Sequence, residues 1–194
     1  MKKILFTGFE PFGGESINPS WEAVSLLPLE IGEYSINKLL IPVVFGEAAQ
    51  IVIDKAENTA YDVIICVGQA GGRNAITPEL VGINLRYASI PDNKGNQPRD
   101  ELIKGNGETA FFSTLPVRKI TEAINTCQIP SQVSYSAGTY VCNDLFYTLL
   151  SHFNGTKTRV GFIHIPYCKE QNKEPSIDIN DIVKGLIVVV ENMD

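Results

Sequence analysis

The stretch Tyr61-Asp-Val-Ile-Ile-Cys-Val67 decides the class of fold, because every residue after Asp62 is apolar. A strand with one face in solvent alternates apolar and polar side chains. An unbroken apolar run of this length is instead typical of a strand in a parallel sheet whose two faces are both covered. The stretch therefore predicts a central buried strand, and the rest of the chain has to supply the layers that cover it.

On both sides of this stretch, signals for strands and helices alternate along the chain. Apolar runs predict strands at residues 3–7, 36–44 and 132–136, and a loose alternation predicts a pair of strands within residues 74–90. Periodic apolar positions predict helices at residues 18–27, 47–58, 116–127 and 178–191, with Asn18 and Pro19 opening the first of them. The polar stretch 93–108 is expected to be a surface loop. These elements predict a single α/β domain over residues 1–194 with a mostly parallel sheet.

The composition and charge of the chain argue against several classes of function. The chain has 194 residues, of which 44% are hydrophobic, and a formal net charge of −6, so it can bury a core but offers nucleic acid no basic surface. Its N-terminal apolar run is about four residues long, shorter than the roughly 7–15 of a signal peptide, and no run approaches the ~20 of a membrane helix. We therefore expect a cytoplasmic protein with no nucleic-acid partner and no membrane partner.

The chain contains four cysteines without a Cys-x-x-Cys pair: Cys66, Cys127, Cys142 and Cys168. Reduced thiols are expected from this pattern, and Cys66 reads as a small buried residue of the central strand. His164 and Cys168 are close in sequence, but Pro166 breaks any helix that would place both on one face. The sequence therefore predicts no metal site and no cofactor.

Cys142 is the cysteine whose position best suits a nucleophile. The predicted strand at 132–136 is followed by a turn of small residues, Ala137 and Gly138. Beyond this turn, apolar residues recur at helical spacing: Val141, Leu145, Leu149 and Phe153. Cys142 is therefore expected in the first turn of a helix, where unpaired backbone N–H groups favour a thiolate. A structural role for the thiol is the alternative, and its position alone leaves both open.

His164, one of two histidines, lies near the end of the apolar run 160–165. Ligands and catalytic groups collect at the carboxyl ends of strands in open α/β sheets, so His164 is the candidate base for Cys142. Such a base needs an acid that orients it. Glu79 is the candidate acid, because it stands among apolar residues after a glycine-rich loop. Glu79 is also compatible with a solvated carboxylate at the edge of the sheet.

Two loops that contain glycine follow predicted strands. Residues 7–14 lack the spacing of a dinucleotide-binding loop, and Phe9, Pro11 and Phe12 would crowd a pyrophosphate. Aromatic side chains beside glycines suit the wall of a ligand pocket instead. Residues 67–73 can present backbone donors to a small polar ligand. Both loops are also compatible with plain strand-to-helix turns.

Six motifs occur in a fixed order along the chain: Phe9-Glu-Pro-Phe-Gly-Gly14, Pro42-Val-Val-Phe-Gly46, Ile90-Pro-Asp-Asn-Lys-Gly95, Phe112-Ser-Thr-Leu-Pro116, Ser136-Ala-Gly-Thr-Tyr-Val-Cys-Asn143 and His164-Ile-Pro-Tyr167. Together they resemble the pyroglutamyl peptidase I family, also called pyrrolidone-carboxylate peptidases. The cysteine motif is specific when it is found with the histidine motif. The resemblance implies a three-layer α/β/α sandwich with a mixed sheet, and it implies a homotetramer.

The resemblance also implies an activity and a set of site residues. The activity is that of a cytoplasmic cysteine peptidase that removes an N-terminal pyroglutamyl residue from peptides, without a metal or cofactor. The catalytic residues that it implies are the nucleophile Cys142, the base His164 and the acid Glu79. The substrate-binding residues that it implies are Phe9, Phe12, Asn18, Gln69, Tyr140 and Val141. The expected reaction is acyl transfer through a thioester on Cys142, started by a thiolate that His164 and the helix start produce.

The chain departs from the family pattern at three positions. Leu80 stands where the family usually carries arginine after the glutamate, and Tyr87-Ala-Ser89 replaces Asp-Ala-Arg, whose arginine normally lies close to the active site. Two other functions stay compatible with the scaffold. One is a non-catalytic binder of pyroglutamyl groups or similar cyclic amides. The other is an enzyme like the nucleoside phosphorylases, for which the chain lacks a basic cluster to bind phosphate.

Overall fold

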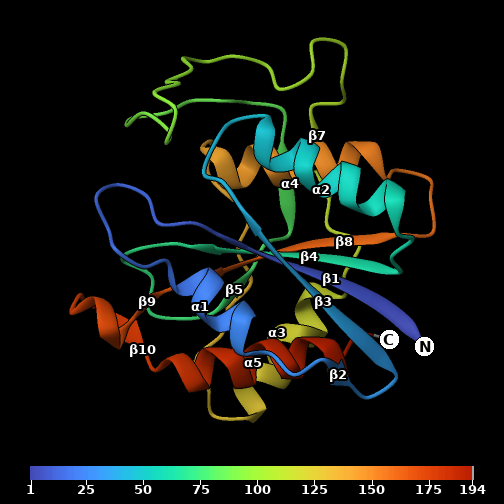
Figure 1. Cartoon of the computed structure of the whole chain (residues 1–194), viewed down its shortest axis with the longest axis vertical. Coiled ribbons are helices and arrows are strands. Elements are labelled where there is room, and N and C mark those ends of the chain that lie inside the picture. The colour runs from blue at the N-terminus through green and yellow to red at the C-terminus, as the bar shows by residue number, and fades with distance from the viewer. Residues whose placement is uncertain (194) are drawn as a thin grey trace.

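The computed structural model describes residues 1–193, and its centre is a six-stranded sheet with the order β2-β3-β1-β4-β8-β5 (Figure 1). The strands of this sheet are β1 (Lys2–Phe9), β2 (Glu30–Ile31), β3 (Tyr34–Ile41), β4 (Val63–Gln69), β5 (Thr77–Pro78) and β8 (Arg159–Ile165). The strands β1, β3, β4 and β8 run parallel, whereas β2 and β5 are antiparallel to their neighbours. The sheet is therefore mixed and mostly parallel, as predicted.

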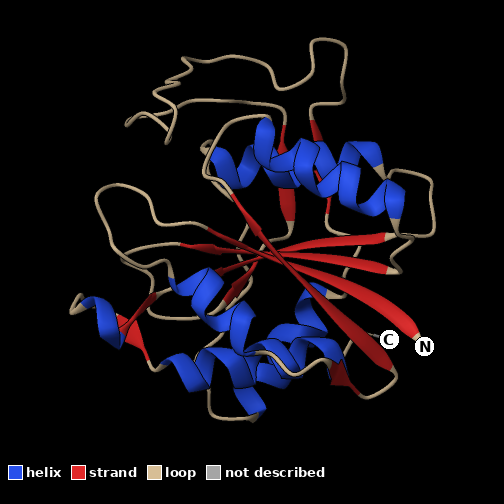
Figure 2. Ribbon diagram, in the orientation of Figure 1, coloured by secondary structure: helices blue, strands red, loops and turns tan. Residues whose placement is uncertain are grey.

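Helices cover both faces of this sheet (Figure 2). One face carries α1 (Pro19–Leu26), α3 (Val117–Thr126) and α5 (Ile179–Glu191), and the other carries α2 (Glu47–Asn58) and α4 (Val141–His152). The side chains of alternate residues of β4 pack into the two cores, one on each face of the sheet. Ile65 and Val67 pack in the core below α1, α3 and α5, whereas Ile64 and Cys66 pack in the core below α2 and α4. The predicted α/β/α sandwich is confirmed, and so is the central strand covered on both faces.

The helix boundaries follow from local signals in the sequence. Asn18 caps α1, because its Oδ1 accepts a hydrogen bond from the backbone N–H of Ser20 at 3.1 Å, and Pro19 fills the first helical position. The helix predicted at residues 47–58 coincides with α2. Residues 93–108 contain no named helix or strand, which agrees with the predicted loop. Within residues 1–193, no helix combines the length and apolarity needed to cross a bilayer.

The strand predicted at residues 132–136 is wrong. This segment runs beside β5 but forms only isolated bridges, through Ser131 and Ser134. The backbone N–H of Ser134 donates to the carbonyl of Pro78, and the N–H of Leu80 donates to the carbonyl of Ser134. Pro78 lies where the next ladder bond would be donated, and proline has no N–H. The ladder is therefore interrupted at Pro78.

The strand pair predicted within residues 74–90 is only half right. Two short strands form there, β5 and β6 (Val81–Ile83), but they do not pair with each other. β5 pairs with β8 in the main sheet, and β6 pairs with β7 (Ala110–Phe112) in a separate two-stranded ribbon. After β8 the chain forms β9 (Tyr167–Cys168), the 3₁₀ helix η1 (Lys169–Gln171) and β10 (Ser176–Ile177). These small elements were not predicted, since two- or three-residue strands leave no periodic signal.

Candidate active site

The predicted nucleophile Cys142 is the second residue of α4. Gly138 turns the chain before the helix with a φ of 78°, a left-handed conformation that glycine adopts without strain. Tyr140 is the N-cap residue of α4, and its side chain makes no capping bond to the helix start. The backbone N–H groups in the first turn of α4 therefore receive no cap from this side chain, and they lie beside Cys142. Cys142 as a whole residue is partly exposed.

Gly68 brings Cys142 next to His164. A Cβ atom at Gly68 would lie only 3.0 Å from Sγ of Cys142, so the sulfur rests directly on this glycine. Gly68 on β4 is the register partner of His164 on β8. Register partners in a sheet direct their side chains to the same face, and neighbouring strands are about 4.8 Å apart. The thiol and the imidazole therefore lie side by side on the face that α4 covers.

Glu79 completes this group from the other side of the imidazole. Nδ1 of His164 lies 2.7 Å from Oε1 of Glu79, and their exposed fractions are 4% and 0%. Thr77 on β5 pairs with His164 on β8, and its hydroxyl donates to the carbonyl of His164 at 3.2 Å. Pairing of β5 with β8 therefore sets the distance between carboxylate and imidazole. The structure brings Cys142, His164 and Glu79 together, as the sequence predicts.

Arg73 is a further member of this group that the sequence analysis missed. Its Nη1 donates to Oε1 of Glu79 at 2.8 Å and to the hydroxyl of Thr77 at 2.5 Å, and its Nη2 donates to the carbonyl of Ser136 at 3.3 Å. Oε1 of Glu79 therefore accepts from both Arg73 and His164. The available signal was an arginine that closes a glycine-rich loop six residues before a glutamate among apolar neighbours.

Burial and neighbouring charges shift the pKa values of the thiol and the imidazole in this group. Burial, followed by the charge of Glu79, raises the pKa of the Cys142 thiol to about 12, although the charge of Arg73 opposes the shift. Burial also lowers the pKa of His164, although the hydrogen bond that its ring donates to Glu79 opposes this shift. Burial therefore disfavours both charged forms, the thiolate of Cys142 and the imidazolium of His164.

The residues predicted to bind substrate divide into exposed and buried ones. Phe12 and Tyr140 are partly exposed, with ring centroids 6.4 Å apart, and Phe45 packs edge-on against Tyr140 at 5.3 Å. Phe9 and Val141 expose only 2% and 0% of their surface and belong to the core beneath α2 and α4. Of the residues predicted to bind substrate, Phe12 and Tyr140 therefore offer partly exposed aromatic rings, and Phe45 adds a third ring beside Tyr140.

Asn18 and Gln69, the two residues predicted to make polar contacts with the substrate, already have different hydrogen-bond partners within the protein. The Asn18 side chain caps α1 and also donates through Nδ2 to the carbonyl of Glu10 at 3.0 Å, so its oxygen and nitrogen are both in use. Gln69 follows Gly68 at the end of β4, and its Oε1 accepts from Nε2 of Gln171 at 2.9 Å. Gln69 therefore lies beside the nucleophile, while Asn18 serves first as a helix cap.

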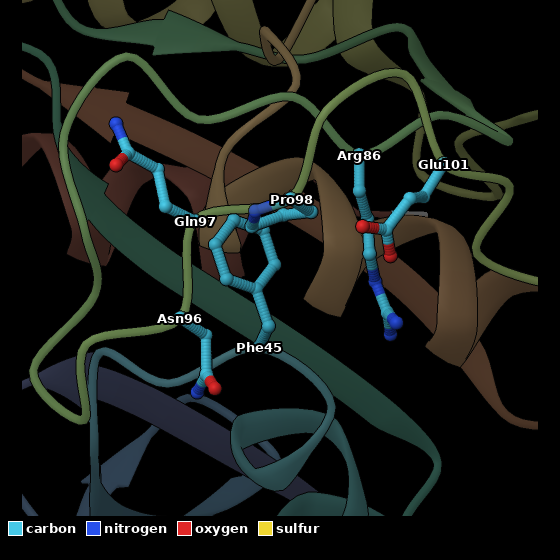
Figure 3. A pocket seen from close by; sticks show the side chains of 6 residues that line it. All are labelled: Phe45, Arg86, Asn96, Gln97, Pro98 and Glu101. Carbon is cyan, nitrogen blue, oxygen red and sulfur yellow. The ribbon is translucent and has the colours of Figure 1, made fainter.

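Two cavities lie near this group. One, of about 410 Å³, is bordered by Arg73, Thr77 and residues 132–136. The other, of about 370 Å³, is lined by six residues: Phe45, Arg86, Asn96, Gln97, Pro98 and Glu101 (Figure 3). In this second cavity Nε of Arg86 donates to Oδ1 of Asp144 at 2.5 Å. Within residues 1–193, no cluster of three or more His, Cys, Asp or Glu side chains is arranged to hold a metal.

The residues at the three departures from the family pattern make their hydrogen bonds away from Glu79 and His164. Ser89 is exposed, and its carbonyl accepts from Nε2 of Gln97 at 2.9 Å. Tyr87 is also exposed, and its hydroxyl accepts from Nη1 of Arg99 at 3.0 Å. Leu80 is half-buried beside the 132–136 segment. Arg73 supplies the guanidinium that faces Glu79 in this chain.

Comparison with known proteins shows which family the chain resembles. The sequence model of the family described as "Pyroglutamyl peptidase" matches residues 2–194. The pyrrolidone-carboxylate peptidase of Staphylococcus saprophyticus is 47% identical over 196 residues, covering 97% of this chain and 92% of its own length. That of Thermosipho africanus is 48% identical over 195 residues, covering 97% and 95%.

Solved structures match equally well. The crystal structure of pyroglutamyl peptidase I from Bacillus amyloliquefaciens superimposes with a TM-score of 0.95 at 46% identity, covering 100% of this chain and 97% of that one. Pyrrolidone carboxyl peptidase from Thermococcus litoralis gives a TM-score of 0.94 at 36% identity, with 100% and 93% covered. The chain therefore belongs to the pyroglutamyl peptidase family.

Proposed function

We propose that this protein is a cysteine exopeptidase that removes an N-terminal pyroglutamyl residue from peptides. The observation that carries the proposal is the row of Cys142, His164 and Glu79 at the carboxyl edge of the sheet, with the sulfur resting on Gly68 and the imidazole bonded to a buried carboxylate. Nucleophile, base and orienting acid in this order are the elements of acyl transfer. Membership of the pyroglutamyl peptidase family supports the same activity.

The first step is attack of the thiol on the carbonyl that links pyroglutamate to the next residue. Because Nδ1 of His164 faces Glu79, Nε2 is the nitrogen left to accept the proton from Sγ of Cys142. The sulfur forms a bond to the carbonyl carbon as it loses its proton. The N–H groups in the first turn of α4 are placed to stabilise the negative oxygen of the tetrahedral intermediate. Glu79 stabilises the imidazolium that forms in this step.

The second step releases the shortened peptide. The imidazolium of His164 gives its proton to the leaving amine, the C–N bond breaks, and the pyroglutamyl group stays on Cys142 as a thioester. Water then attacks the thioester with His164 again acting as base, and pyroglutamate leaves. The atoms and charges balance without a metal or cofactor.

The proposed substrate group is a flat, neutral lactam, which suits aromatic walls and amide partners. Phe12 and Tyr140 offer the exposed aromatic surface. The backbone of Gln69 at the end of β4 is the proposed partner for the lactam amide, with Asn18 contributing from the start of α1. Phe9 and Val141 support this wall from the core. A charged N-terminal amine would be desolvated without an acidic partner among these six residues.

An assay with a fluorogenic pyroglutamyl amide tests the proposal. The wild-type protein should release the fluorophore, whereas Cys142→Ala should bind the amide without turnover. Matched amides of glutamine and proline should be poor substrates, because neither presents a neutral lactam. Binding without turnover by the wild-type protein would instead favour the alternative, a non-catalytic binder of cyclic amides.

We also infer how the protein is organised and where it works. Both apolar cores share the one sheet, which supports a single catalytic domain over the whole chain. The homotetramer and the cytoplasmic location are further parts of the proposal. Light scattering after gel filtration tests the first, and fractionation of cells tests the second.

A further inference from the structure

Arg73 and Glu79 form an ion pair at the end of the row that begins with Cys142. The Glu79 side chain is completely buried, whereas the Arg73 side chain is 28% exposed. A buried carboxylate without a positive partner would be strongly disfavoured, and it would take up a proton at a much higher pH than usual. Arg73 therefore stabilises a buried negative charge, which an arginine on the open surface does not do.

The position of Arg73 is fixed by three hydrogen bonds, two of them to β5 and the residue after it, and one to the segment before α4. Thr77 on β5 accepts from its guanidinium, Glu79 follows that strand, and the Ser136 carbonyl lies in the segment that leads to α4. The Thr77 hydroxyl in turn donates to the backbone of His164. Arg73 thus connects the strand that carries the acid, the strand that carries the base and the segment that precedes the nucleophile.

Few other ionisable groups face this row. The charges that act on His164 are those of Glu79 and Arg73, and those that act on Cys142 are Glu79, Cys66 and Arg73. Arg73 is the one permanent positive charge in both sets. Glu79, His164 and Arg73 together are neutral when the imidazole is neutral.

We propose that Arg73 is a positioning residue that sets the pH at which His164 becomes able to accept a proton. The inference rests on the proposed function and deepens it. Without Arg73, the Glu79–His164 pair would carry a net negative charge in a buried place. The pair would then keep one additional proton, on either Glu79 or His164, up to a higher pH than it does when Arg73 is present. The sign of the effect therefore does not depend on which group titrates.

The test compares Arg73→Gln with two other variants. Arg73→Lys retains the positive charge but not the planar fork that bonds Glu79, Thr77 and Ser136. Arg86→Gln is the matched control, since Arg86 also pairs with a fully buried carboxylate, Asp144, and is 24% exposed. The readouts are the midpoint of the acid limb of kcat/KM, and the pH dependence of alkylation of Cys142 by iodoacetamide in the protein without substrate.

We expect Arg73→Gln to move the acid midpoint of kcat/KM upward by about 1–2 pH units, and to move the alkylation profile in the same direction. Arg73→Lys should retain the wild-type midpoint with a lower kcat, and Arg86→Gln should retain the midpoint with lower thermal stability. An acid midpoint that does not move in Arg73→Gln, or that moves equally in Arg73→Gln and Arg86→Gln, would overturn the proposal.

The test still gives an answer if Arg73→Gln does not fold or if the wild-type protein shows no peptidase activity. If Arg73→Gln does not fold, a displaced midpoint in Arg73→Lys would still refute a role that depends on charge. If the wild-type protein hydrolyses no pyroglutamyl amide, the proposed function fails. The alkylation profiles would then still decide whether Arg73 controls the protonation of the Cys142 row.

Discussion

Cys66 and Cys142 both pack in the core on the face of the sheet that α2 and α4 cover, and they differ in almost everything that makes a thiol reactive. Burial raises the pKa of each thiol to about 12. Cys66 is completely buried in the middle of β4. Cys142 is partly exposed at the start of α4, next to His164 and the buried Glu79.

A raised pKa therefore does not by itself separate an inert thiol from the proposed nucleophile. What Cys142 gains at the edge of the sheet is partial exposure, a neutral base and helix N–H groups that can bind an oxyanion. Cys66 has none of the three, because the strand interior is closed on both faces. Position at the carboxyl edge, rather than the acidity of the resting group, distinguishes the two.

Cys142→Ala should give the largest effect. We expect kcat to fall by at least ~10³–10⁴, the scale seen when a member of such a triad is removed. Cys66→Ala is the matched interior variant and should retain kcat while lowering the free energy of unfolding by about 1 kcal/mol. Steady-state kinetics and urea unfolding of both proteins check the pair. Near-normal turnover in Cys142→Ala would contradict the view that the thiol at the edge of the sheet is needed for turnover and the thiol in its interior is not.

Glu79→Gln removes the partner of the base but keeps its shape. We expect kcat to fall on the order of 10²–10⁴, because the amide does not stabilise the imidazolium and does not fix the tautomer of His164. Circular dichroism should confirm that the variant folds. Full activity in a folded Glu79→Gln protein would reduce the row to a pair of Cys142 and His164.

Phe9→Ala and Phe12→Ala repeat the same contrast with aromatic residues. Phe9 is buried in the core, so its truncation should lower the free energy of unfolding by about 3–5 kcal/mol. Phe12 is partly exposed beside Tyr140, so its truncation should raise KM by a factor of roughly 10–100 with little loss of stability. Measured KM and unfolding curves should separate the two variants. Equal effects of both on KM would place Phe9 in the pocket after all.

Ser89→Arg should give the smallest effect. Ser89 is exposed, and the arginine would restore the residue common in the family without entering the core. We expect kcat/KM to change by less than about threefold and the free energy of unfolding by less than about 0.5 kcal/mol. A folded but inactive variant would mean that the site depends on the serine.

Much of the fold could be predicted because its signals are local. The apolar run of β4, the cap at Asn18 and the periodicity of α2 each lie within a few residues. The broken ladder at residues 132–136 was missed because it depends on Pro78, which is more than fifty residues earlier in the chain. Contacts of this kind are decided by which segments become neighbours in space.

The grouping of the three candidate catalytic residues could be predicted from the sequence, whereas the burial of one candidate wall residue could not. Cys142, His164 and Glu79 carry sequence signals of their own, and the structure brings them together. Phe9 was expected in a loop after Thr7, but β1 continues to Phe9, and the two-residue period then directs its side chain into the same core as Leu5. Arg73 was missed because its pairing with Glu79 requires the turn between them to fold back.

The bare backbone of Gly68 has a consequence for every variant of this protein. A methyl group at this position would stand 3.0 Å from Sγ of Cys142 and 2.8 Å from the ring of Phe162. Even alanine would thus press on the sulfur and on the ring, so at least one of the two would have to move aside. Residue 68 therefore limits which variants can keep this arrangement of Cys142, although it contributes no chemical group to the proposed reaction.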